Sequence, residues 1–318
     1  MEEEAAVSRQ AHISAEPRLD RRRFDPESLA FLSPATLILF LLFLAPVGYS
    51  FYLGLTNLQL IGPNSTNFRF TGTFNIRAML RDMEFYHSLW VTMLFVVGSG
   101  AIGSTIGGLV LAMLIQVGTP FLRGVVGASA MLACTLPPVT VAFMWHASTT
   151  TGGVFPFLLG VPKAELLYTY PMTVVSVANV WWLCGLSMLM FGAALRNVSH
   201  EMIEAALLER ANAVQRFVRI TLPTLRPTIV TSALLMSLLS FGNFTLIFLM
   251  TGGGPANATN ILPLYSYMQG FTFHRLAFGA LLGNVIVLLS AILGVVFVLI
   301  SYYSARRATS VKKLGAQP

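Results

Sequence analysis

The chain has 318 residues, of which 55% are hydrophobic and only 10% are charged. A soluble domain carries about 25% charged residues, so the composition excludes a soluble globular protein and indicates an integral membrane protein. The net charge of +7 does not indicate nucleic-acid binding. The basic residues lie at the ends of apolar runs, where such residues set membrane topology.

Residues 1–28 are polar and rich in Glu and Arg, which predicts a cytoplasmic tail without a cleavable signal. A membrane-spanning helix needs about 20 apolar residues. Stretches of that length without Asp, Glu, Lys or Arg are Leu29–Leu55, Ser88–Ile115, Gly124–Ala147, Tyr170–Leu195, Thr228–Met250 and Ala277–Tyr303. The sequence therefore predicts an all-α integral membrane protein with six transmembrane helices over residues 29–303 and a second cytoplasmic tail over 304–318.

Two features within the spans predict details of helix geometry. Pro137-Pro138 should kink the third span, because proline removes a backbone donor. Small residues in the second span predict close helix packing, and they are Gly98, Gly103, Gly107 and Gly108.

The basic residues predict the orientation of the chain. Six spans place both termini on one side of the membrane, and fifteen of the 20 basic residues fall on that side. Because cytoplasmic loops carry the excess of Lys and Arg, we expect both termini and the segment 197–226 to be cytoplasmic. The expected location is a prokaryotic inner or plasma membrane.

The chemistry that the spans lack restricts the mechanism. Ion-coupled carriers commonly place ionisable groups within the membrane, but the spans hold no acidic or basic residue, and His146 beside Trp145 is more typical of packing. A P-loop needs a Gly-Lys-Ser/Thr sequence, yet none of the three lysines follows a glycine. We expect no catalytic residue, metal site or nucleotide site in this chain, so an ATP-driven process would need a separate ATPase polypeptide.

A polar, charge-dense segment lies between Val198 and Pro227, and its sequence is SHEMIEAALLERANAVQRFVRITLPTLR. It resembles the EAA loop of ABC-importer permeases, which docks into an ATPase subunit. Further matches to the carbohydrate-importing, maltose-type family are Asn179-Val180-Trp181-Trp182, Met190-Phe191-Gly192 and Leu249-Met250-Thr251-Gly252-Gly253-Gly254-Pro255.

This resemblance covers the chain from about residue 28 onward and implies a type I ABC-importer permease. It further implies a second permease subunit, two ATP-binding subunits that hold ATP and Mg²⁺, an external solute-binding protein and a sugar substrate.

The resemblance also assigns the residues that couple the permease to the ATPase. Glu204 is expected at the head of a docking helix, where its carboxylate favours the helix N-terminus. Arg210 stands where the family usually has glycine, so either the turn differs or its docking geometry is altered. The full set of coupling residues is Glu204, Ala205, Ala206, Glu209, Arg210, Ile220, Leu222 and Pro223.

A sugar path should use uncharged polar side chains and aromatic rings, because sugars offer hydroxyls and C–H faces. In the fifth span, Ser240, Asn243 and Ile247 would share one helical face, with Phe244 adjacent. Asn243 is the foremost candidate. For each of these residues taken alone, packing or interhelical hydrogen bonding is the more common role. The remaining path candidates are Asn179, Trp182 and Asn284.

Two alternative functions remain open at this point. A permease for glycerol phosphate or glycerophosphodiesters would share the loop pattern, although its anionic substrate would favour basic groups that the spans lack. A secondary carrier or a non-transporting membrane scaffold is the alternative from another class, and neither accounts for the segment 197–226.

Overall fold

The computed structural model describes residues 26–314, with side chains from 31 to 301, and the regular elements within this range are helices joined by loops. The described residues form no strand beyond a single bridge between Thr56 and Phe70. A helical chain suits a bilayer because each helix satisfies its own backbone hydrogen bonds. The predicted all-α class is therefore confirmed.

The chain divides after Ser50 into two units. In the first, α2 (Pro26–Leu39), a π-helical turn η1 (Phe40–Leu44) and the start of α3 (Ala45–Gly54) run on from one another. In the most apolar part of the candidate span Phe31–Gly54, no residue is buried against the rest of the chain. This is the first of the predicted spans, and α2 already begins within the predicted tail 1–28. Residues 1–25 of that tail lie outside the described range.

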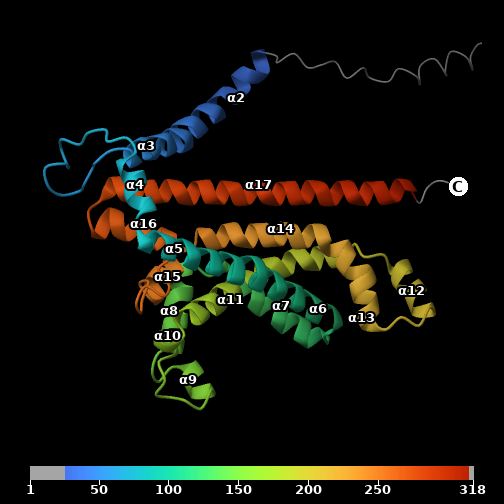
Figure 1. Ribbon diagram of the computed structural model, residues 1–318. Coiled ribbons are helices and arrows are strands. Elements are labelled where there is room, and N and C mark those ends of the chain that lie inside the picture. The colour runs from blue at the N-terminus through green and yellow to red at the C-terminus, as the bar shows by residue number, and fades with distance from the viewer. Residues whose placement is uncertain (1–25, 315–318) are drawn as a thin grey trace, which may run out of the picture. The chain divides into compact units, whose positions relative to one another are not determined.

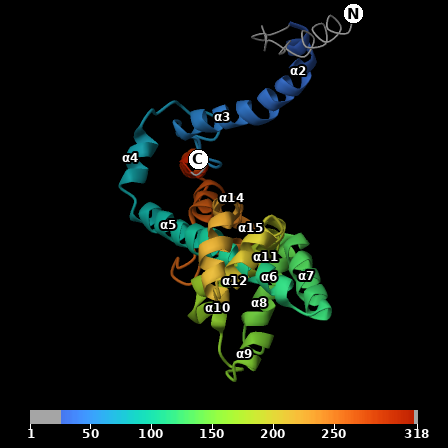
Figure 2. The same cartoon turned by 90° about the vertical axis from the view of Figure 1, so that its right-hand side faces the viewer.

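The second unit contains the remaining spans. Its second span is one continuous run made of α5 (Met83–Met93), the π-helical η2 (Leu94–Ser104) and α6 (Thr105–Val117), preceded by the short α4 (Phe74–Leu80). The fourth span is α11 (Pro171–Leu195), which follows the short helices α9 (Val154–Leu158) and α10 (Leu166–Thr169). Figures 1 and 2 show α11 beside α6, α7 and α14, against which it packs.

The third span is broken rather than merely kinked. Its two helices, α7 (Pro120–Thr135) and α8 (Pro138–Thr149), meet at an angle of 112°. Leu136 and Pro137 have extended backbones between them, because proline cannot donate and its ring pushes the preceding residue out of the helical region. Within residues 26–314, five helices are long and apolar enough to span a membrane, and this bent pair makes six if it counts as one span.

The fifth span differs from its predicted form. Its helix begins before the predicted span, through α13 (Ala213–Arg216) and η3 (Phe217–Thr221), continues as α14 (Leu222–Phe241), and ends at Phe241. Gly242 and Asn243 then separate α14 from α15 (Phe244–Met250). Asn243 is non-helical, with φ −85° and ψ 52°. The predicted single helix over Thr228–Met250 is therefore wrong.

The chain ends in a helix that is longer than the sixth predicted span. After α16 (Leu262–Tyr267) and η4 (Met268–Thr272), α17 runs from Leu276 to Leu314. Its membrane-spanning part is Leu276–Ser301. Residues 304–314 of the predicted tail thus continue the helix, and residues 315–318 lie outside the described range.

Close helix contacts in the core depend on small residues, as predicted for the second span. A Cβ built on Gly108 of α6 would lie 2.4 Å from the side chain of Ser187 in α11. A Cβ built on Gly103 would likewise lie 2.6 Å from the side chain of Val180 in α11. A Cβ on Gly98, in contrast, would have no neighbour within 4 Å. The second and fourth spans can approach so closely only because these residues lack a side chain.

Candidate functional site

A buried polar cluster joins three elements of the core, with Asn179 of α11 at its centre. Its side-chain Nδ2 donates to Ser99 Oγ of η2 and to Ser240 Oγ of α14, each over 2.9 Å. Its Oδ1 accepts from Asn243 Nδ2 over 2.9 Å. None of the four side chains is more than 4% exposed. The structure thus brings together three of the predicted path residues, Asn179, Ser240 and Asn243.

Two local features make the cluster possible. A Cβ on Gly100 of η2 would lie 2.5 Å from Ser240 Oγ, so only glycine lets α14 approach here. Ser99 lies in the π-helical η2, and such segments occur often at functional sites. Sequence reasoning missed Ser99, and the available signal was its place in the small-residue run Gly98-Ser99-Gly100.

Hydrogen-bonding capacity differs between the two asparagines. Both N–H groups and the carbonyl oxygen of Asn179 are used within the cluster. Oδ1 of Asn243, in contrast, is buried without a hydrogen-bond partner. An unsatisfied buried acceptor costs about 1–3 kcal/mol. Within this cluster Asn243 is therefore the residue with capacity for another donor.

An aromatic ladder, defined here as Phe244, Phe248, Tyr267 and Phe271, begins directly after Asn243. Its neighbouring ring centroids lie 5.1–5.4 Å apart across α15, α16 and η4. Phe248 is 39% exposed and Phe271 is 55% exposed. Only Phe244 was predicted from sequence. The spacing i, i+4 within each aromatic pair was the signal for the others.

Trp182 and Asn284 have other surroundings. The indole N–H of Trp182 donates to the carbonyl of Leu136 over 3.0 Å, so it satisfies an acceptor at the break between α7 and α8. Asn284 is 5% exposed, and its Nδ2 lies 3.2 Å from the position that a Cβ on Gly54 would occupy. His146 contacts the carbonyl oxygen of Met250 through Nδ1 over 3.0 Å, consistent with the packing role favoured from sequence.

The predicted coupling segment forms a helix that nothing in the described chain covers. This helix, α12 (His200–Leu208), has no buried residue. Its apolar side chains Met202, Leu207 and Leu208 are 54%, 50% and 86% exposed. Figure 1 shows α12 and α13 extending from the end of the bundle. An exposed apolar helix face of this kind fits the groove of another protein.

The start of α12 corrects one expectation. The helix begins at His200, and Ser199 is its N-cap, whose side chain accepts from the backbone N–H of Met202. Glu201 occupies the first turn, and Glu204 lies in the middle of the helix. The expected placement of Glu204 at the helix head is therefore wrong, because the capping serine was overlooked. Glu204, Ala205 and Glu209 are exposed, as expected of contact residues.

The end of α12 excludes one of the two alternatives for Arg210, namely a different turn. Arg210 adopts φ +55°, in the left-handed region. Its backbone N–H donates to the carbonyl of Leu207, and that of Ala211 donates to the carbonyl of Ala206. These two bonds are the Schellman motif, whose left-handed position normally favours glycine. The glycine-type turn is retained, and arginine occupies it at a cost of roughly 1 kcal/mol.

The remaining coupling residues belong to the second half of the segment. Asn212 and Gln215 form a capping box that starts α13. Ile220 lies in η3, while Leu222 and Pro223 begin α14, and these three side chains are half-buried. After the turn at Arg210, the segment thus continues as one helical run from Ala213 to the part of α14 that carries Ser240.

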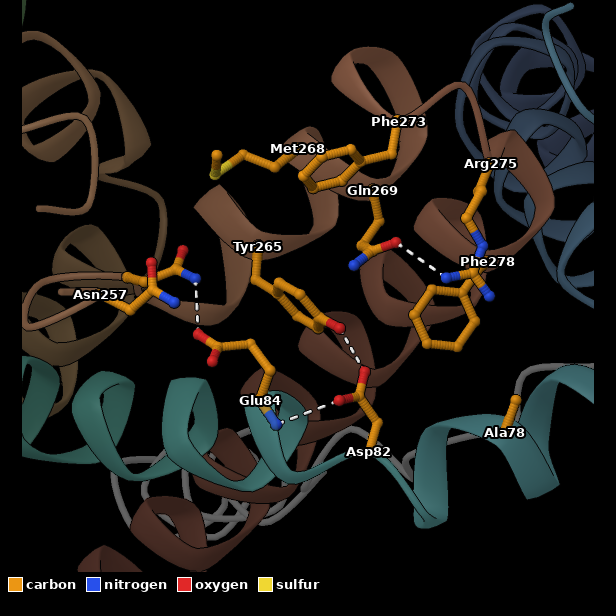
Figure 3. A pocket seen from close by; sticks show the side chains of 11 residues that line it. Ala78, Asp82, Glu84, Asn257, Tyr265, Met268, Gln269, Phe273, Arg275 and Phe278 are labelled. Carbon is orange, nitrogen blue, oxygen red and sulfur yellow. Dashed lines mark hydrogen bonds between the residues drawn. The ribbon is translucent and has the colours of Figure 1, made fainter.

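Sequence reasoning missed a pocket of about 460 Å³ beside the N-terminus of α5 (Figure 3). Asp82 caps α5 by accepting from the Glu84 N–H over 3.0 Å, and it also accepts from the Tyr265 hydroxyl. Glu84 accepts from Asn260 Nδ2 over 2.9 Å. Burial, followed by the bond to Asp82 and its charge, raises the pKa of Tyr265 above its usual range. Arg275 lies 4.7 Å from the ring centroid of Phe278.

These bonds join the start of the second span to the segment between the fifth and sixth spans. The signal in the sequence was the acidic pair Asp82 and Glu84 directly before an apolar run. Among the residues that the structure describes, no three His, Cys, Asp or Glu side chains gather as metal ligands would.

The fold and site define a multi-pass helical membrane protein with an uncharged polar cluster between its spans and an exposed two-helix segment at one end. Residues 104–310 match the family model of the binding-protein-dependent transport system inner membrane component. The chain belongs to this family.

Similar proteins agree with that assignment. A probable ABC transporter permease protein of Sinorhizobium fredii is 32% identical over 79% of this chain and 82% of its own length. The trehalose transport system permease protein SugA of Mycobacterium tuberculosis is 27% identical over 87% of this chain and 89% of its own length. A chain of a bacterial alginate ABC transporter, solved with an alginate pentasaccharide-bound periplasmic protein, superposes with a TM-score of 0.68 at 22% identity, covering 90% of this chain and 96% of that chain.

Proposed function

We propose that this chain is the permease subunit of an ATP-driven carbohydrate importer. The observation that carries the substrate class is the continuity between the uncharged cluster around Asn179 and the aromatic ladder that starts at Phe244. Amides and hydroxyls match the hydroxyl groups of a sugar, and exposed ring faces match its C–H faces. The similarity to a trehalose permease and to an alginate transporter supports the same class.

The uncharged character of the cluster argues against a glycerol phosphate or phosphodiester as substrate. A phosphate group would favour arginine or lysine beside it, and the four cluster residues are two asparagines and two serines. The named relatives reported above support sugars rather than phosphate esters.

The energy for transport enters through α12. In this proposal α12 docks into a groove of a separate ATPase subunit, which binds ATP and Mg²⁺, and this chain has no catalytic role. The exposed residues Met202, Leu207 and Leu208 supply the apolar contact, and Glu204 supplies a charge for a basic residue of the ATPase. A second permease subunit, two ATPase subunits and an external solute-binding protein complete the importer.

Coupling follows the covalent route from α12 through α13 and η3 to α14. Movement of α12 shifts α14, and Ser240 near the end of α14 moves relative to Asn179. The bond from Asn179 to Ser240 then breaks, and the path beside it opens to one side of the membrane at a time. This is alternating access between two states that the ATPase favours differently. Both termini and α12 are cytoplasmic in this scheme, and the pocket around Asp82 faces outward.

Uptake into cells that express the complete importer tests this function. Radiolabelled neutral sugars and glycerol phosphate are compared, with the cognate solute-binding protein first screened for its ligand. Replacing the P-loop lysine of the ATPase subunit should abolish sugar uptake. Sugar uptake that survives this replacement would favour a secondary carrier, and ATP-dependent uptake of glycerol phosphate alone would favour the other substrate class.

A further inference from the structure

A pair of arginines marks a cavity that the transport mechanism leaves unexplained. The cavity has a volume of about 500 Å³ and lies between α6, α7 and α11. Arg123 and Arg196 both line it. A second cavity of about 540 Å³ shares Gln116 and Arg196 with the first and extends to His200 and Ile203 of α12. The two cavities therefore adjoin at the root of the coupling segment.

The two arginines lie at the level where a membrane span ends. Arg196 follows Leu195, the last residue of the fourth span, and Arg123 is in the first turn of α7, shortly after the second span ends at Val117. Basic side chains at this depth meet lipid headgroups.

The guanidinium groups are available for a ligand. Nη2 of Arg123 donates to the carbonyls of Gln116 and Gly118, over 3.3 and 3.4 Å. These bonds hold the group at the end of α6 while its other N–H groups stay unused. Arg196 is exposed; its backbone N–H donates to the carbonyl of Ala194, and its guanidinium has no hydrogen-bond or ion-pair partner among the residues that the structure describes. Two arginines on one cavity suit a phosphate group, which accepts several charge-assisted bonds.

The rest of the cavity is apolar and extends into the membrane. Its apolar lining comes from α6 and α11 and consists of Ala112, Ile115, Met188, Leu189, Gly192 and Ala193. Met188 lies eight residues before Arg196 in α11, so this lining reaches about 12 Å below that arginine at 1.5 Å per residue. A free phosphate or an acidic peptide would leave this apolar part unfilled. An acyl chain would fill it.

We propose that this cavity is a binding site for an anionic phospholipid, with the headgroup phosphate between Arg123 and Arg196 and an acyl chain along Leu189 and Gly192. Basic pockets between spans on the cytoplasmic side are suited to such lipids. The adjoining cavity places a bound headgroup beside His200, so the lipid also braces the first turn of α12.

Native mass spectrometry tests this site on the full chain, purified in detergent with its co-purifying subunits. Phosphatidylglycerol and phosphatidylcholine with identical acyl chains are added at equal concentrations. Retention of phosphatidylglycerol should exceed that of phosphatidylcholine. The double variant Arg123→Gln/Arg196→Gln should lose this preference, by about fivefold for each arginine. The matched control Arg219→Gln removes an exposed arginine that lines neither cavity and should retain the lipid.

A second variant tests the acyl part without changing the charge. Nothing lies within 4 Å of a Cβ built on Gly192, so Gly192→Leu should enter the cavity without strain and exclude the chain. It should therefore weaken retention while both arginines remain. Inorganic phosphate at matched ionic strength should not displace the lipid. Equal retention of the two lipids by the unmodified chain, unchanged retention in either variant, or full displacement by phosphate would each overturn the proposal.

Discussion

The side-chain amide of Asn243 donates to Oδ1 of Asn179 over 2.9 Å, and this bond joins two spans through residues 64 positions apart in sequence. Both N–H groups and the carbonyl oxygen of Asn179 are hydrogen-bonded inside the cluster, whereas the carbonyl oxygen of Asn243 has no partner. The two asparagines therefore have different roles. We propose that Asn179 holds the helices together and that Oδ1 of Asn243 accepts from a hydroxyl of the substrate.

Asn243→Leu should impair uptake while the complex still assembles. The substitution removes one hydrogen bond of the cluster and its free acceptor, and a lost neutral bond of about 1 kcal/mol corresponds to about a fivefold lower rate. Uptake into proteoliposomes, together with size-exclusion chromatography of the complex, measures both properties. Wild-type uptake by this variant would remove Asn243 from the path.

Asn179→Leu should instead reduce stability. It leaves Ser99, Ser240 and Asn243 without their shared partner in a buried site, at a cost of about 1–3 kcal/mol for a buried group left unsatisfied. A lower thermal midpoint in detergent, relative to Asn243→Leu, is the expected outcome. Equal midpoints for the two variants would show that the central asparagine is not the structural one.

The exposure of Glu204 in the middle of α12 predicts its effect on coupling. Glu204→Lys should lower uptake and substrate-stimulated ATP hydrolysis together, because the reversed charge repels a basic residue of the ATPase. Sugar binding by the external protein should not change. Glu165→Lys makes the same charge change at an exposed position that lies after α8 and before α11, at the other end of the spans, and it is the control. Normal coupling in Glu204→Lys would contradict the docking role of α12.

The left-handed backbone of Arg210 predicts that glycine is accepted there. Arg210→Gly should preserve transport and relieve up to about 1 kcal/mol of backbone strain. Arg219→Gly is the matched control. It places glycine in the helical η3, where it should destabilise by about 1 kcal/mol. Thermal unfolding of both variants measures the contrast, and a loss of stability at position 210 equal to that at 219 would contradict the assignment of the turn.

Topology is tested by cysteine labelling of a variant that lacks Cys134 and Cys184. A cysteine at Ser199 should react only from the cytoplasm, and one at the exposed Asn257 should react only from outside. The motivation is the excess of basic residues on the side of the termini. Labelling of position 257 from the cytoplasm would reverse the orientation proposed for the pocket around Asp82.

The parts of this fold that sequence predicted are those that local chemistry decides. The apolar stretches predicted where the spans lie, and Pro137-Pro138 predicted a kink at the place where the third span is broken, because a proline lacks a backbone donor in any surroundings. The break at Gly242 was not predicted, because glycine is common in membrane helices and the bond from Asn243 to Asn179 comes from a distant span.

The candidate site shows the same division. Asn179, Ser240 and Asn243 were predicted by residue type, but the cluster needs the close approach at Gly100 and the π-helical placement of Ser99, which no local pattern encodes. The predicted grouping of Asn243 with Ile247 on one helical face was wrong, because the helix ends at Phe241 and Asn243 is not helical. The glycine-type turn at Arg210 was not predicted, since the sequence there lacks the glycine that usually marks it.

Sugar uptake into proteoliposomes tests the central claim most directly. The chain is reconstituted with its second permease and ATPase subunits, the solute-binding protein and its sugar are added outside, and ATP is either enclosed or omitted. Accumulation of the sugar only with enclosed ATP, and its loss in Glu204→Lys, is the result predicted here. Accumulation without ATP, or without the ATPase subunits, would contradict an ATP-driven permease.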